Sequence, residues 1–250
     1  MKTITFSAIK GGVGKSSLCI LVANFLAALG LRVLVIDMDI QNSTTFYYSP
    51  EEELTDKNNI FRALSDDDLK GNIIKTEIDI IPSSFNLIKI RAISEKTLSK
   101  ITGQISDDYD YCLIDTAPTF DNIVLNAVIA SDLIITPVFF SQFDWKSACF
   151  FRDQIDLETD KISNWKVLLN KYKKPRTDNP DTELNQYNQV YNEEFKDSLL
   201  DTKIPDTSYV KKSIDTKTVI SKSKTKIKLY NAISSLCSEI TEIKTQPERF

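Results

Sequence analysis

The chain has 250 residues, with 31 Lys and Arg against 35 Asp and Glu, and therefore a formal net charge of −4. Its 42% hydrophobic and 26% charged residues are typical of a soluble globular protein and exclude a largely disordered or collagen-like chain. The negative net charge of the whole chain argues against a nucleic-acid partner.

The residue types present also limit the chemistry. There is no histidine and no CxxC pair, which argues against a Cys/His zinc site and a histidine base. No apolar run reaches the roughly 18–20 residues of a membrane span. We expect no cleaved signal peptide, a cytosolic protein and reduced core thiols; the cysteines are Cys19, Cys112, Cys149 and Cys237.

The predicted elements alternate between strands and helices along the chain. An Ala/Leu-rich segment predicts a helix over 16–29, and the acidic 51–70 segment is expected to be a solvated peripheral helix or loop. Strands separated by helical crossovers predict one α/β domain over 1–250, a P-loop fold whose mostly parallel, twisted sheet has helices on both faces. Apolar runs predict strands over 3–9, 32–37, 77–82, 109–115, 132–137 and 165–170, and 172–182 is expected to be a surface loop.

A Gly-rich loop, KGGVGKSS, stands between the first strand and the first helix. Its glycines permit a tight turn whose N–H groups form an anion site at a helix N-terminus. Lys15 supplies a charge for β/γ-phosphates, the Ser16 hydroxyl is placed to ligate Mg²⁺, and Ser17 reaches the α-phosphate. The alternative is a Gly-rich turn that binds nothing. The nucleotide-binding residues expected here are Lys10, Gly11, Gly12, Val13, Gly14, Lys15, Ser16 and Ser17.

A second lysine distinguishes this loop from an ordinary P-loop. An ordinary P-loop would have glycine where Ile9 stands, whereas this chain has Lys10 five residues before Lys15. KGGVGKS resembles the deviant Walker A motif of the ParA/MinD superfamily. The resemblance implies ATP and Mg²⁺ as cofactors and an ATP-dependent homodimer, in which Lys10 acts on the partner's phosphates. The alternative is a solvated lysine beside the loop.

Two strands end in acidic side chains. The DMDIQ stretch is similar to the first switch of ParA-type ATPases, which implies Asp37 near Mg²⁺, Asp39 at the attacking water and Gln41 near the γ-phosphate. Most relatives have proline where Ile40 stands, and Asp39 as a helix N-cap stays an alternative. The apolar strand ending in Asp115 is typical of a Walker B strand, which holds Mg²⁺ through a bound water.

Later positions match the family more loosely. The resemblance implies an adenine contact for Asn170 and a base-packing contact for Pro205, although Asn-Lys after a strand is also a common turn. Residues 201–230 hold eight lysines and three aspartates, a local charge of +5 that suits phosphate binding without sequence readout. A merely solvated face is the alternative. The candidate DNA-binding residues are Lys211, Lys212, Lys222, Lys224 and Lys226.

The resemblance as a whole implies a nucleoid-associated ATPase that binds DNA non-specifically. It would segregate a plasmid or chromosome with a ParB-like partner that stimulates hydrolysis. The chain begins at its first strand, so no N-terminal helix-turn-helix is expected, and its acidic tail with Pro247 disfavours membrane binding. The alternatives are a MinD-like or other positioning ATPase that acts on a protein complex, an iron–sulfur carrier, and a kinase or ligase.

Overall fold

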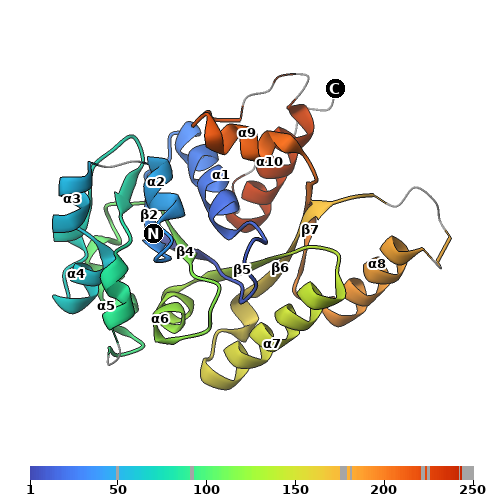
Figure 1. Ribbon diagram of the computed structural model, residues 1–250, viewed down its shortest axis with the longest axis horizontal. Helices are drawn as coiled ribbons and strands as arrows, with labels where there is room; N and C mark the ends of the chain where they lie inside the picture. Colours follow the sequence, from blue (N-terminus) through green and yellow to red (C-terminus); the bar gives the residue numbers. More distant parts are fainter. Residues whose placement is uncertain are drawn as a thin grey trace.

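A parallel sheet forms the centre of the protein (Figure 1). The computed structural model describes residues 1–48, 51–90, 93–174, 179–180, 182–220, 223, 226–241 and 243, and within them seven strands lie in the order β3-β2-β4-β1-β5-β6-β7. All neighbouring strands pair in parallel. The strands are β1 Lys2–Phe6, β2 Val33–Met38, β3 Asp79–Ile81, β4 Tyr111–Thr116, β5 Leu133–Val138, β6 Trp165–Tyr172 and β7 Leu199–Pro205.

Helices cover both faces of this sheet, with α1, α9 and α10 on one side and α6 and α7 on the other (Figure 1). The α-helices are α1 Lys15–Ala28, α2 Ser43–Tyr48, α3 Glu52–Lys57, α4 Ile60–Ser65, α5 Thr97–Thr102, α6 Asn122–Ala130, α7 Gln142–Glu158, α8 Glu183–Glu194, α9 Ser208–Asp215 and α10 Ile227–Thr241. Short 3₁₀ helices span Lys70–Asn72, Phe85–Lys89, Gly103–Ile105 and Ile162–Asn164. The predicted fold class, a mostly parallel sheet with helices on both faces, is confirmed.

The alternation of side chains along each strand divides the core in two. In β2, Val33 and Val35 pack with α1 and α10, whereas Leu34 and Ile36 pack with α4, α5 and α6. Successive strand residues point to opposite faces, so an uninterrupted apolar run is what a sheet buried on both faces requires. This explains why these strands could be predicted as continuous apolar segments.

Two segments differ from the expectation. The 51–70 region was expected to be solvated, but Ile60, Ala63 and Leu64 of α4 are buried in the core. Their spacing places them on one face of the helix, and the acidic residues of this region lie before and after α4 rather than in it. No apolar run predicted the edge strand β7, although the resemblance implies a strand end at Pro205; β7 pairs with β6 through irregular register and packs under α10.

Candidate functional site

The loop between β1 and α1 has the geometry of an anion site. Gly12 and Gly14 have φ values of +77° and +101°, in the left-handed region that glycine adopts without strain. A Cβ on Gly14 would lie 2.4 Å from Nδ2 of Asn170, so packing also requires glycine there. Helix α1 begins at the next residue, Lys15, and a left-handed turn followed by a helix N-terminus is suited to hold phosphate.

Lys15 folds back over this loop. Its side chain is buried, and its Nζ donates to the backbone carbonyl of Lys10 at 3.3 Å. Burial lowers the pKa of Lys15, while the nearby carboxylates of Asp115 and Asp39 oppose that shift. The lysine therefore lies between the loop and the acidic strand ends, where a bound phosphate would give it a counter-charge.

The two strand-end acids Asp37 and Asp115 lie side by side because β2 and β4 are neighbours, with these residues paired in register. Both side chains are fully buried. Burial raises the pKa of Asp37 to about 6, and burial together with the charge of Asp37 raises the pKa of Asp115 to about 7. The nearby Ser16 hydroxyl opposes the shift of Asp115, which places Ser16 beside this carboxylate. Two buried carboxylates with one neighbouring lysine form a site suited to a cation.

Two threonines that sequence reasoning missed hold these carboxylates. The Thr44 hydroxyl donates to Oδ2 of Asp115 at 2.7 Å, and the Thr45 hydroxyl and backbone N–H both donate to Oδ2 of Asp37 at 2.7 Å. Both lie at the start of α2, directly after the DMDIQ switch. A pair of hydroxyl side chains just beyond a switch motif was the signal that could have revealed them.

An unpaired oxygen marks the place where a metal fits. Oδ1 of Asp115 is buried and has no hydrogen-bond partner within the described residues. Buried carboxylate oxygens are normally satisfied, and one left open beside Ser16 and Asp37 matches the oxygen ligands that Mg²⁺ prefers. The donor set predicted from the sequence therefore fits the metal it was predicted to bind.

Asp39 and Gln41 lie in the turn that follows β2. Oδ1 of Asp39 accepts the backbone N–H of Gln41 at 2.9 Å, and the Asp39 side chain is 7% exposed. Helix α2 starts only at Ser43, so Asp39 closes a local turn rather than capping that helix. The Gln41 side chain is exposed. One carboxylate oxygen of Asp39 thus stays free of described partners, beside Lys15.

Lys10 is not a freely solvated lysine. Its Nζ lies 2.6 Å from Oδ2 of Asp144, whose side chain is 1% exposed, whereas the Lys10 side chain is 37% exposed. Asp144 sits in the first turn of α7, where its backbone N–H donates to Oγ of the N-cap Ser141. Sequence reasoning missed Asp144, since it lies 134 residues away and reads as an ordinary first-turn helix acid.

Asn170 and Pro205 line one cavity of about 480 Å³ next to the P-loop, together with Gly12, Gly14 and Ser17. The Asn170 amide is occupied locally: Nδ2 donates to the carbonyl of Val13 at 2.8 Å and Oδ1 accepts from the N–H of Lys171. Asn170 therefore holds the P-loop through the carbonyl of Val13, and its contact with adenine remains a prediction. Lys211 also lines this cavity.

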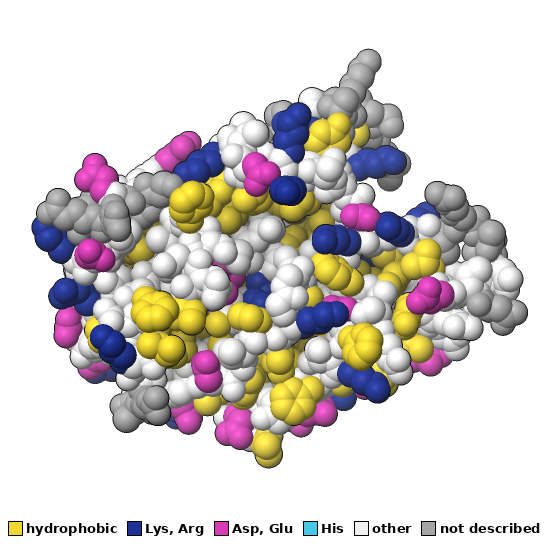
Figure 2. Space-filling view, in the orientation of Figure 1, with side chains coloured by type: hydrophobic (Ala, Val, Ile, Leu, Met, Phe, Trp, Pro, Cys, Tyr) yellow, Lys and Arg dark blue, Asp and Glu magenta, His cyan; other side chains and the backbone are white. Residues whose placement is uncertain are grey.

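The remaining candidate lysines are only partly described. Lys211 and Lys212 are exposed on α9, and the partly buried Lys226 immediately precedes α10. Lys222 and Lys224 lie outside the described residues. Basic side chains are visible over the region of α9 and α10 at the upper edge of Figure 2. No helix in the described ranges is both long and apolar enough to cross a membrane.

Comparisons with known proteins agree with this geometry. Residues 1–164 match a family described as an AAA domain. The chain is 31% identical, over 76% of its length and 81% of the other, to an uncharacterized protein of Methanocaldococcus jannaschii. It is 31% identical to the sporulation initiation inhibitor protein Soj of Bacillus subtilis, over 55% of this chain and 58% of Soj. A Borrelia burgdorferi plasmid partition protein bound to AMPPNP aligns over 97% of this chain and 99% of its own, with 29% identity and a TM-score of 0.77.

The chain belongs to the ParA/MinD superfamily of P-loop NTPases. The P-loop, the two acidic strand ends and the extra lysine, on which the resemblance to this family rests, lie at the same edge of the sheet. The aligned regions span little more than half of Soj, so what that whole protein does is not carried over directly. In this ParA-type chain, the P-loop, Asp37 and Asp115 lie close together in the tertiary structure.

Proposed function

We propose that this ParA-type protein binds ATP with Mg²⁺, hydrolyses the γ-phosphate, and forms an ATP-dependent homodimer that holds DNA non-specifically. In this proposal it is a cytoplasmic, nucleoid-associated protein that segregates a plasmid or chromosome with a ParB-like partner. The Borrelia burgdorferi relative named as a plasmid partition protein supports the DNA cargo. The single 1–250 domain would carry all of these activities.

The observation that carries the proposal is the open carboxylate oxygen of Asp115. It lies among Asp37, Ser16 and the P-loop lysine, where the chain leaves one buried acceptor unsatisfied. When bound, Mg²⁺ would neutralise phosphate charge and polarise the transferred phosphoryl group. Ser16 and Asp115 would hold the metal, with Asp37 close to its ligand shell.

The other side chains would position and stabilise the reacting groups. Lys15 supplies a buried positive charge at the P-loop, where it is worth more than in water. Asp39, held by the turn at Gln41, would orient the attacking water and accept its proton. Lys10, once released from Asp144, would supply a second charge to the partner subunit's phosphates.

The test is retention of the purified protein on random-sequence DNA with ATP, with ADP and without nucleotide, at increasing salt. We expect retention that depends on ATP and falls with increasing salt. The Asp39→Ala variant should stay on DNA, because it no longer hydrolyses the ATP that holds the dimer together. Asp156→Ala, which removes an exposed carboxylate on α7, is the control. Hydrolysis without DNA binding would overturn the DNA proposal and favour a positioning ATPase whose cargo is a protein complex.

A further inference from the structure

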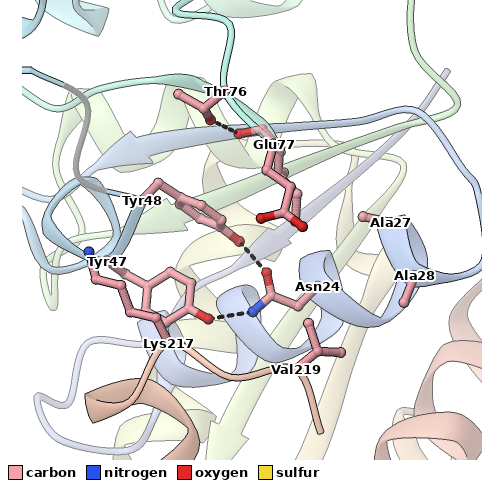
Figure 3. Close-up of a pocket in the computed structure, with 10 residues that line it drawn as sticks. Asn24, Ala27, Ala28, Tyr47, Tyr48, Thr76, Glu77, Lys217 and Val219 are labelled. Carbon is pink, nitrogen blue, oxygen red and sulfur yellow. Dashed lines mark hydrogen bonds between the residues drawn. The ribbon is translucent and has the colours of Figure 1, made fainter. Parts of the chain in front are cut away.

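A cavity of about 300 Å³ lies between α1, α2, the turn before β3 and the segment after α9 (Figure 3). Polar side chains on its wall bond to each other: Nδ2 of Asn24 donates to the Tyr47 hydroxyl at 2.7 Å, and Oδ1 accepts from the Tyr48 hydroxyl at 3.3 Å. Glu77 and Lys217 both line the cavity, so neither sign of charge dominates it. The outer face of α7, on the other side of the sheet, differs because its apolar side chains are exposed.

Three large apolar side chains project from this outer face of α7. Phe143, Phe150 and Leu157 are 74%, 53% and 74% exposed. They are spaced seven residues apart, so at about 100° per residue they form one stripe along the helix. No other α-helix in the described part of the chain contributes more than one exposed large apolar side chain. Hydrophobic side chains are visible in the lower part of Figure 2, over the region of α7.

The inner face of the same helix is already used by the fold. Ala148, Phe151 and Ile155 are buried with side chains of β5 and β6. These positions lie about 130° around the helix from the exposed stripe. The stripe therefore points away from the sheet, and a surface from outside the described chain would have to cover it.

The stripe also carries one positive and one negative side chain, placed on either side of Phe150. Lys146 lies four residues before it and Asp153 three residues after it, on the same face of the helix. Lys146 is exposed and makes no ion pair or hydrogen bond within the described ranges. Asp153 is 63% exposed; its Oδ1 accepts from Nε of Arg152 at 3.1 Å, and its Oδ2 has no partner among the described residues. The surface is therefore complementary in charge to a copy of itself turned end for end.

We propose that α7 pairs in antiparallel orientation with α7 of a second copy of this chain, about a two-fold axis at Phe150. In this arrangement the two Phe150 rings stack at the axis, and Phe143 packs on the partner's Leu157. Lys146 of each copy meets Asp153 of the other, at positions along the axis that differ by about 1.5 Å. In a parallel arrangement each lysine would face a lysine and each aspartate an aspartate, which is unfavourable.

This pairing is separate from the proposed ATP-dependent dimer. Asp144, which holds Lys10 beside the P-loop, lies in the first turn of α7. The centre of the stripe at Phe150 is about 9 Å farther along the helix, which covers one face of the sheet. Pairing through α7 therefore needs neither ATP nor hydrolysis and should occur in nucleotide-free protein.

The test is sedimentation equilibrium of the full-length protein with EDTA and without nucleotide, so that an ATP-dependent dimer does not contribute. We expect a monomer–dimer equilibrium with a dissociation constant of about 50 µM, as for a small interface. Phe150→Asp places two carboxylates at the axis and should raise this constant about tenfold, while circular dichroism shows the fold retained. Glu158→Lys, which changes an exposed acid on α7 outside the stripe, is the control and should leave it unchanged. A protein that stays monomeric at about 500 µM would overturn the proposal.

Two charge variants test the antiparallel register. Lys146→Asp and Asp153→Lys should each raise the dissociation constant about tenfold, since each places like charges opposite one another. An equimolar mixture of the two variants should associate as tightly as the natural sequence, because every aspartate of one variant then faces a lysine of the other. Dimers of the natural sequence combined with a mixture that stays monomeric would refute pairing through α7.

Discussion

The ion pair between Lys10 and Asp144 leads to a sharp prediction about dimerisation. In the isolated chain, the amine of Lys10 is held 2.6 Å from a carboxylate that is almost completely buried. If Lys10 serves the partner subunit's phosphates, each chain must first break this pair. Asp144→Asn keeps the size of the side chain and the helix start at Ser141, and removes only the charge that retains the lysine.

The magnitude follows from the geometry. A charge-assisted hydrogen bond contributes about 1.5–3 kcal/mol, and solvent screening of the 37% exposed lysine reduces this pair to about 1.4 kcal/mol. Two pairs are broken for each dimer, which gives about 3 kcal/mol. Asp144→Asn should therefore lower the dimer dissociation constant about 100-fold in the presence of a non-hydrolysable ATP analogue.

The assay is sedimentation equilibrium over a dilution series, with the analogue and Mg²⁺ present. The matched control is Asp156→Asn, which removes an exposed carboxylate further along the same helix and should leave the dissociation constant unchanged. A dissociation constant for Asp144→Asn that is unchanged or higher would show that Asp144 does not retain Lys10 in the monomer. It would then have to act within the dimer itself.

Three further variants test the site itself. Thr45→Val removes a donor to Asp37 and the acceptor of the Ser83 N–H, and should lower the free energy of unfolding by about 1–3 kcal/mol in urea titrations; a change below about 0.5 kcal/mol would contradict the assigned contacts. Gly14→Ala places a Cβ 2.4 Å from the Asn170 amide at a φ of +101° and should weaken nucleotide binding at least tenfold by calorimetry, whereas Gly103→Ala, which meets nothing within 4 Å, should not. Lys15→Ala should abolish nucleotide binding while circular dichroism shows the fold retained, and unaltered affinity would contradict the placement of Lys15 at the phosphates.

Local sequence was sufficient for those features whose cause is local. Strands β2 and β4 are mostly apolar up to their acidic ends because a sheet covered on both faces buries every residue of these central strands. The loop glycines are required by backbone conformation, and Asp115 follows an apolar run because it ends a buried strand. Parallel strands share one carboxyl edge, so the meeting of Asp37 with Asp115 could be predicted without coordinates.

Other features could not be predicted because their cause is distant in the chain. The hydrogen bond from the Asn170 amide to the carbonyl of Val13 depends on the approach of β6 to the P-loop, and the expected adenine contact of Asn170 stays a prediction. The buried apolar face of α4 was not predicted, because the acidic composition of residues 51–70 indicated a solvated segment. Glu77, Tyr48 and Asn24 belong to three unrelated segments, and only the packing of α2 against α1 gives them a common cavity.

Sequence by itself determined the P-loop, its two acidic partners and the parallel sheet, since each depends on backbone conformation or on burial that repeats over a few residues. Tertiary structure alone decided what the charged side chains are bound to. Lys10 and Lys15 are the same residue type, but their contacts differ. Lys10 pairs with Asp144, 134 residues away, whereas Lys15 is buried over its own loop. A side-chain partner is set by which elements pack together, and that is a property of the whole fold rather than of any short segment.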